Sequence, residues 1–162
     1  MPCISPLTFP GISKAVVKAT SYEHDPFGIT TEEADMIASM QVKRLRKEPF
    51  LVQETENLVE VFGPEEDPTL VVWGSTLGVA REVAQTLGLR IVQPLVLRPF
   101  PRATVKNALS KASKVIVCET NATGQLARLL SQQGIRVDAT ILRYDGRPFS
   151  IESLQKEVEK EL

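Results

Sequence analysis

The 162-residue sequence is poor in the side chains that most often bind metals or form disulfide networks. It contains two cysteines, Cys3 and Cys118, and a single histidine, His24. There is no Cys-x-x-Cys pair, and no histidine stands near either cysteine, so neither has the spacing of a zinc or iron–sulfur ligand. We therefore expect no metal site in this chain. A Cys3–Cys118 disulfide is not favoured in a reducing compartment.

An excess of positive charge and a long apolar run are also missing. Lys and Arg number 19 against 20 Asp and Glu, which gives a formal net charge of −1. Proteins that bind nucleic acids or membrane surfaces carry a basic excess, so both classes are disfavoured. No apolar run approaches the ~20 residues of a membrane span, and the first ten residues lack the basic start and apolar run of a signal peptide. We expect a soluble, cytoplasmic protein, and a homodimer stays open.

The composition changes near residue 50. Residues 1–49 hold prolines at positions 2, 6, 10, 26 and 49 and the pattern of one helix, over about residues 31–47. Thr30 and Glu33 have the spacing of a capping box, and Pro49 prevents the helix from continuing. We therefore predict an extended N-terminal arm with one helix, followed by a folded domain over residues 50–162.

Strand and helix patterns alternate along residues 50–162. We predict a hairpin in which residues 50–52 and 58–62 flank a turn at 54–57, further strands at 70–73, 89–97, 114–118 and 135–142, and helices at 79–87, 103–112, 125–133 and 151–162. Strands that alternate with helices form mostly parallel sheets with helices on both faces. The expected fold is a three-layer α/β/α domain with a mostly parallel five-stranded sheet and an antiparallel edge strand or hairpin.

The first candidate site follows the predicted strand at 70–73. Gly74 permits a sharp exit from the strand, and either Ser75 or Thr76 can cap the next helix. Free backbone amides at such a turn can also face an anion. The loop lacks the Gly-Lys-Ser/Thr ending of a phosphate loop and the third glycine of a dinucleotide fingerprint. A plain strand–helix turn and a ligand-facing loop both remain open.

The second candidate site follows the predicted strand at 114–118. Glu119 stands at a buried strand end, where an unpaired carboxylate costs several kcal/mol, so it requires a hydrogen-bond partner, an ion pair or solvent. A structural partner is favoured over catalysis. Asn121 or Thr123 can cap the following helix, which begins at Gln125, and Gly124 permits close approach of a ligand or backbone.

The third cluster, Glu23-His24-Asp25, holds the only histidine. A metal-binding or proton-relay role is conceivable from the residue types, but adjacent residues in an irregular segment rarely converge on one point, so a hydrogen-bonded, structural His24 is favoured. The sequence contains no Gly-x-Ser-x-Gly elbow and no His-Glu-x-x-His. We assign no catalytic residue.

The sequence resembles the carboxyl-terminal, transketolase-like domain of the alpha subunit of 2-oxoacid:ferredoxin oxidoreductases, together with the stretch before it. The resemblance is colinear over essentially the whole chain. It is carried by the following segments: Ser5-Pro6, Pro10-Gly11, Glu23-His24-Asp25 with Gly28, Lys43-Arg44, Arg46-Lys47, Trp73-Gly74-Ser75-Thr76, Pro99-Phe100-Pro101, Glu119 with Asn121 and Thr123-Gly124-Gln125-Leu126-Ala127-Arg128-Leu129, and Tyr144-Asp145-Gly146-Arg147-Pro148-Phe149.

The resemblance implies a part in the oxidative decarboxylation of a 2-oxo acid to an acyl-coenzyme A, with electrons passed to ferredoxin. The assembled enzymes use thiamine diphosphate, magnesium and iron–sulfur clusters. This sequence has no Gly-Asp-Gly with a downstream Asn for the metal and diphosphate, and no cysteine set for a cluster. The implied role is therefore a non-catalytic module, inactive alone, that contacts a thiamine-diphosphate-binding beta subunit and a pyrimidine-domain chain. The Glu-His-Asp and Tyr-Asp-Gly-Arg-Pro-Phe elements resemble the 2-oxoglutarate branch.

Two other functions stay open at this point. One is a free-standing, flavodoxin-like protein that binds a small molecule or phosphate through the loops at Gly74–Gly78 and Glu119–Gln125. The other is a beta-type chain of a different thiamine-dependent dehydrogenase, which would share the fold.

Overall fold

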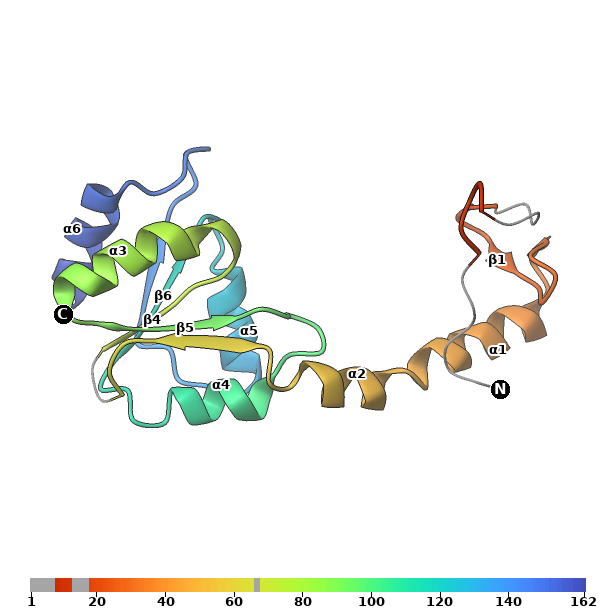
Figure 1. Cartoon of the computed structure of the whole chain (residues 1–162), viewed down its shortest axis with the longest axis horizontal. Helices are drawn as coiled ribbons and strands as arrows, with labels where there is room; N and C mark the ends of the chain where they lie inside the picture. The colour runs from red at the N-terminus through yellow and green to blue at the C-terminus, as the bar shows by residue number, and fades with distance from the viewer. Residues whose placement is uncertain (1–7, 13–17, 66–67) are drawn as a thin grey trace. The chain divides into compact units, whose positions relative to one another are not determined.

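The computed structural model describes residues 8–12, 18–65 and 68–162. The chain divides into two compact units, Met1–Gln53 and Glu54–Leu162 (Figure 1). Cys3 lies outside the described residues, as do Ser5 and Pro6 of the first motif. None of the helices in the described ranges has the length and apolar character that crossing a bilayer requires.

The second unit is built on a five-stranded sheet. Its strands are β3 (Val59–Phe62), β4 (Thr69–Val71), β5 (Arg90–Pro94), β6 (Val115–Glu119) and β7 (Ala139–Leu142), in the order β3-β5-β4-β6-β7. Strand β3 runs antiparallel to β5, and the other pairs are parallel. The predicted mostly parallel sheet with an antiparallel edge strand is confirmed.

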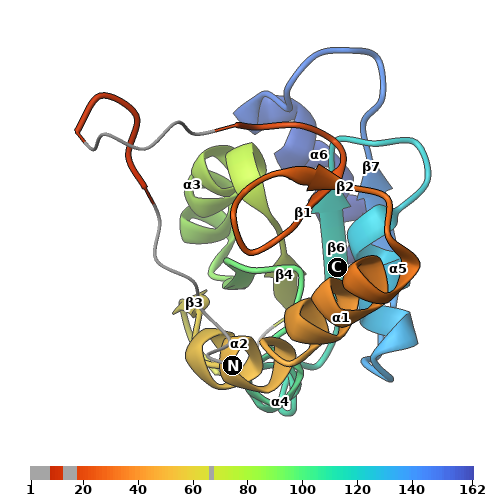
Figure 2. The same ribbon diagram turned by 90° about the vertical axis from the view of Figure 1, so that its right-hand side faces the viewer.

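Helices cover both faces of this sheet (Figures 1 and 2). On one face, α3 (Leu77–Leu87) and α6 (Ile151–Glu161) pack on the side chains of Leu70, Ile91 and Ile116. On the other face lie α4 (Arg102–Ala108) and α5 (Gln125–Gln132), which pack on the alternate residues Val71, Val92 and Val117. Every residue of β4, β5 and β6 is buried, as expected for strands covered on both sides. The three-layer architecture is confirmed.

The first unit contains a short antiparallel hairpin of β1 (Glu23–His24) and β2 (Thr30–Thr31), followed by α1 (Ala34–Leu45). A second helix, α2 (Glu48–Thr55), follows α1 and continues into the second unit. Neither α1 nor α2 has a buried residue. Several apolar side chains on the two helices are exposed, among them Leu45 (66% exposed) and Phe50 (59%).

The structure corrects the prediction of a hairpin at residues 50–62. Residues 50–52 belong to α2, and only the segment after the predicted turn forms a strand, β3. Pro49 is the second residue of α2, in the first turn, where a helix needs no backbone N–H donor. Because α1 has already ended at Leu45, Pro49 lies at the start of a second helix, which spans the boundary between the predicted arm (1–49) and the predicted domain (50–162).

Two predicted helix caps are also wrong. Thr30 lies in β2, and α1 begins after Glu33, whose side chain makes no capping hydrogen bond. Neither Ser75 nor Thr76 caps α3 with its side chain, because a 3₁₀ turn, η1 (Gly74–Thr76), leads directly into that helix. A hydroxyl inside a helical turn has lost the extended backbone geometry that capping needs.

Candidate functional site

The winding of the sheet reverses at the carboxyl ends of β4 and β6. The chain leaves β4 through α3 toward β5 on one side, and it leaves β6 through α5 toward β7 on the other. Connections that diverge in this way leave a crevice between two neighbouring parallel strands, and α/β proteins bind ligands in such crevices. The segments after β4 and β6 therefore define the region in which to look for a site.

A cavity of about 530 Å³ opens at these strand ends. We call it the strand-end cavity. Ser75 lines it from the turn after β4, and Thr120 lines it from the loop after β6. The remaining lining residues all follow β7: Arg143, Tyr144, Gly146, Arg147 and Pro148. The cavity thus joins three strand ends that are far apart in the sequence.

The loop after β7 is held by a paired interaction between Arg143 and Asp145. Nε and Nη2 of Arg143 donate to the two carboxylate oxygens of Asp145, each at 3.0 Å, and Nη1 donates to Ser153 Oγ at 3.1 Å. Asp145 Oδ1 also accepts the backbone N–H of Arg147 at 3.1 Å. The Arg143 hydrogen bonds lower the pKa of Asp145 and raise that of Arg143, so both groups remain charged near neutral pH.

Glu119 ends β6 and is completely buried. Its Oε2 accepts the backbone N–H of Leu126 at 2.9 Å and Asn121 Nδ2 at 2.6 Å, while Oε1 accepts the N–H of Ala127 at 3.1 Å. The carboxylate therefore binds two of the N–H groups that the first turn of a helix leaves without partners. This arrangement anchors α5 to β6, and it supports the structural interpretation of Glu119 over the catalytic one.

Asn121 completes the same turn. Its Oδ1 accepts the backbone N–H groups of Thr123 at 3.1 Å and Gln125 at 3.2 Å. Gly124 has a φ of +63°, and a Cβ there would lie 3.7 Å from Glu119 Oε1. A glycine at position 124 therefore allows the left-handed backbone conformation next to the buried carboxylate of Glu119. Thr123 and Gly124 line a different groove, which runs along α5 and includes Arg128.

The structure therefore brings together only part of the predicted site. Of the first candidate loop, Ser75 lines the strand-end cavity, whereas Thr76 is buried (4% exposed) and neither Thr76 nor Gly74 is among the lining residues. Of the second, Glu119 and Asn121 are engaged in the anchoring of α5. Sequence reasoning missed the loop after β7, although the polar run that directly follows the last predicted strand satisfies the same strand-end criterion.

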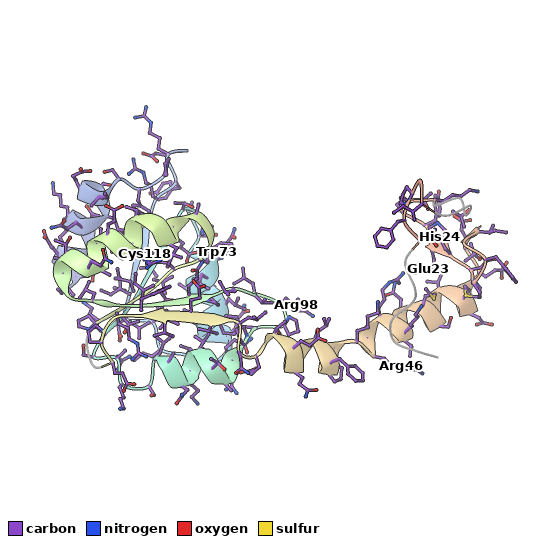
Figure 3. All side chains as sticks on the ribbon, viewed as in Figure 1. Glu23, His24, Arg46, Trp73, Arg98 and Cys118 are labelled. Atoms are coloured by element: carbon purple, nitrogen blue, oxygen red, sulfur yellow. The ribbon has the colours of Figure 1, made fainter. Side chains whose placement is uncertain are left out.

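His24 lies in the hairpin of the first unit (Figure 3). Its Nε2 is 3.2 Å from Thr20 Oγ1. The neighbouring Glu23 is paired with Arg44, whose Nη1 donates to Glu23 Oε2 at 2.7 Å, and this pair lowers the pKa of Glu23. The segment is a hairpin and not the irregular run expected from the sequence. In the described part of the chain, no three His, Cys, Asp or Glu side chains are grouped as metal ligands would be.

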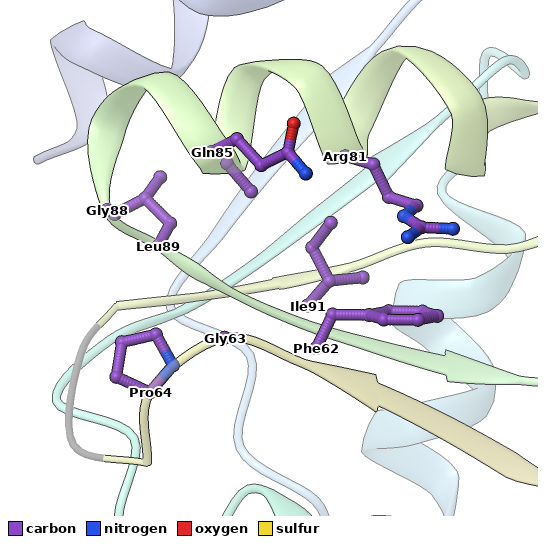
Figure 4. Close-up of a pocket in the computed structure, with 9 residues that line it drawn as sticks. Phe62, Gly63, Pro64, Arg81, Gln85, Gly88, Leu89 and Ile91 are labelled. Carbon is purple, nitrogen blue, oxygen red and sulfur yellow. The ribbon is translucent and has the colours of Figure 1, made fainter.

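A second cavity, of about 370 Å³, lies between α3 and the strands β3 and β5 (Figure 4). The guanidinium carbon of Arg81 stands 4.4 Å from the centre of the Phe62 ring on its wall. Gly63 approaches β5 so closely that a Cβ would be 2.5 Å from the carbonyl oxygen of Leu89. This cavity lies at the start of β5, away from the carboxyl ends of the parallel strands, and its lining is mostly apolar.

A protein family described as pyruvate:ferredoxin oxidoreductase core domain II matches residues 67–154. The match covers more than half of the chain, including β4 to β7 and the strand-end cavity. The chain belongs to this family. The resemblance to 2-oxoacid:ferredoxin oxidoreductase alpha subunits is thereby confirmed, and two relatives agree with it.

One relative is subunit alpha of 2-oxoacid:ferredoxin oxidoreductase 2 from Aeropyrum pernix, which is 34% identical over 146 residues, 85% of this chain and 23% of the relative. The other is a solved structure, 2-oxoglutarate:ferredoxin oxidoreductase from Magnetococcus marinus with 2-oxoglutarate, coenzyme A and succinyl-CoA bound. It is 30% identical with a TM-score of 0.71, and the match covers 98% of this chain and 29% of that one. The chain thus spans about a quarter of the length of these oxidoreductase relatives.

Proposed function

We propose that the chain is a non-catalytic module of a 2-oxoacid:ferredoxin oxidoreductase, which completes the assembly and helps to wall its active-site channel. Membership of the oxidoreductase family supports the enzyme class. The proposal includes contacts with a thiamine-diphosphate-binding beta chain and a pyrimidine-domain chain. In the assembled, cytoplasmic enzyme, coenzyme A would accept the acyl group and ferredoxin would accept the electrons.

The cysteines of this chain do not fit an iron–sulfur cluster, one of the cofactors of this chemistry. An iron–sulfur cluster commonly requires four cysteine thiolates, whereas the sequence contains two cysteines. The thiol of Cys118 is buried, and its pKa is raised to about 12 by burial and by the adjacent Glu119 charge. We therefore derive no catalytic step through thiamine diphosphate, magnesium or a cluster in this chain. Its contribution to turnover would be position and shielding.

The observation that carries the subunit-contact role is the absence of buried residues in α1 and α2. Val42, Leu45 and Phe50 are 47%, 66% and 59% exposed. Helices of globular proteins gain most of their stability by packing an apolar face, and contiguous exposed apolar side chains mark interaction surfaces. Under the proposed function, these exposed apolar side chains would contact a neighbouring chain of the same enzyme.

The experiment is co-purification of the chain with the remaining parts of the enzyme, followed by an assay of 2-oxo acid-dependent dye reduction. 2-Oxoglutarate is the first substrate to test, because it is named for the Magnetococcus relative. We expect activity from the assembly and none from the chain alone. Turnover by the chain alone would refute a non-catalytic module.

Matched variants locate the contact. Leu45→Ser with Phe50→Ser removes two exposed apolar side chains from α1 and α2. We expect at least about a tenfold weaker assembly, since aromatic residues such as Phe are enriched in interface cores and a few buried side chains carry most of the binding energy. Leu95→Ser removes a comparably exposed residue (49%) from the second unit and serves as the control. Equal assembly by both variants and the native chain would exclude this surface as the contact.

A further inference from the structure

We propose that the strand-end cavity binds the phosphate group of a phosphorylated small molecule, with Arg147 as the main anion-binding side chain. The proposal does not depend on the function proposed above, because the cavity is formed by the second unit alone. Its volume of about 530 Å³ is in the range of small-molecule sites. The crevice it occupies is also the position at which α/β folds bind ligands.

The charge on the cavity wall is positive. Arg143 and Arg147 line the cavity, and each carries a guanidinium. The carboxylate of Asp145, which is not among the lining residues, is paired with Arg143. Glu119 precedes Thr120 in the sequence, but it is fully buried, it does not line the cavity, and its oxygens accept three hydrogen bonds within the fold. The guanidinium of Arg147 therefore gives the wall a net positive charge.

Arg147 is the cation with unused hydrogen-bonding capacity. Across the part of the chain that the structure describes, its guanidinium has neither a hydrogen-bond acceptor nor an ion-pair partner, whereas its backbone N–H is bound to Asp145. A planar guanidinium presents paired donors that match the oxygens of a phosphate. The backbone of Arg147 is thus held by Asp145, while the paired N–H donors of its guanidinium are available to a ligand.

The backbone around Arg147 is organised before any ligand arrives. The Asp145 carboxylate accepts from the Arg143 side chain and from the Arg147 backbone, and Gly146 between them takes a φ of +79°. Arg143 is fixed in turn by Ser153 at the start of α6. A loop that is already ordered loses less conformational entropy on binding, which favours affinity.

The opposite wall contributes neutral donors. Ser75 and Thr120 are exposed and line the cavity, and neither hydroxyl has a hydrogen bond within the described ranges. Hydroxyl groups complement a phosphate without the desolvation cost of further charge. Tyr144 also lines the cavity and is 71% exposed, so its ring is available to the organic part of a phosphate ester.

The test is a titration of the ¹⁵N-labelled full chain with inorganic phosphate at constant ionic strength, followed through the backbone amide signals. We expect saturable shifts of the signals of Ser75, Thr120 and Arg147, with a Kd of about 1 mM. Arg147→Ala should raise that Kd at least about tenfold, because it removes a charge-assisted hydrogen-bond pair. Arg147→Lys keeps the charge but loses the fork, and its Kd should lie between the two.

Arg128→Ala is the matched control, since Arg128 is an exposed arginine that lines the separate groove along α5. Its Kd for phosphate should equal that of the native chain. Acetate distinguishes a phosphate site from general carboxylate binding. Shifts that do not saturate, equal weakening by Arg147→Ala and Arg128→Ala, or equal affinity for acetate and phosphate would each overturn the proposal.

Discussion

Removal of the buried carboxylate of Glu119 is the sharpest test of how the strand ends are built. In the folded chain its two oxygens accept the N–H groups of Leu126 and Ala127 and the side-chain amide of Asn121. Leu126 and Ala127 are 2% and 8% exposed, so water cannot replace the lost acceptor. Glu119→Ala would thus strand two buried donors at the start of α5.

The expected magnitude follows from those two donors. A buried polar group without a partner costs about 1–3 kcal/mol, so Glu119→Ala should lower the free energy of unfolding by about 2–6 kcal/mol. That is a large share of the roughly 5–15 kcal/mol that stabilises a typical domain, and this variant can fail to fold. Glu119→Gln keeps one oxygen but turns an amide donor toward existing donors, and we expect a loss of about 1–3 kcal/mol.

The assay is equilibrium unfolding in urea, followed by the fluorescence of Trp73, the only tryptophan, which lies in the same unit. Glu82→Gln is the control, an exposed glutamate on α3 whose replacement should change the free energy of unfolding by less than about 0.5 kcal/mol. If the free energy of unfolding of Glu119→Gln differs from that of the native chain by less than about 0.5 kcal/mol, the anchoring role is wrong and a functional role for Glu119 must be reconsidered.

Three further predictions concern other parts of the second unit. Ser150 caps α6 with its side chain, so Ser150→Ala should lower the free energy of unfolding by about 0.5–2 kcal/mol in the same assay; an unchanged value would contradict the cap. Because its pKa is near 12, Cys118 in a Cys3→Ser chain should not react with a thiol reagent at pH 8 until urea unfolds the protein, and rapid labelling of the folded chain would contradict its burial. The Arg143 hydrogen bonds hold the pKa of Asp145 below its ordinary value of 3.8, so the stability that the carboxylate contributes is complete above that pH and lost as the pH falls through the lowered pKa. A carboxyl titration followed by NMR should show this pKa below 3.8, and a value at or above 3.8 would count against the pair.

The sheet was predictable because its signal is carried by local patterns. Short continuous apolar runs such as those at 70–73 and 114–118 are typical of strands that are buried on both faces. The alternation of strands with helices then restricts the topology to a small set. The helix at 48–55 was not predictable in the same way, because Phe50, Leu51 and Val52 fit a strand as well as a helix, and Pro49 is compatible with an end or a start.

The candidate site was only partly predictable, for a different reason. Which strand ends lie next to one another depends on strand order, and the sequence contains no direct record of that order. Ser75 and Thr120 share a cavity because β4 and β6 are neighbours, and the loop with Arg147 reaches it because β7 follows β6. The partners of Glu119 could not be predicted, because two of them are backbone N–H groups of α5. Every residue except proline carries such a group, so the sequence does not show which ones Glu119 binds.

The sheet of the second unit has no face left to offer another molecule, since its own helices occupy both. A neighbour can reach it through the rim of strand tips, the outer strands β3 and β7, or the outward sides of the helices. New binding properties can therefore arise only at the strand-end loops, the outer strands and the outer helix surfaces. In the loops, insertions and changes of charged residues cost little stability. The interior strands can stay constant while the perimeter diversifies, so one scaffold can serve enzymes with different substrates.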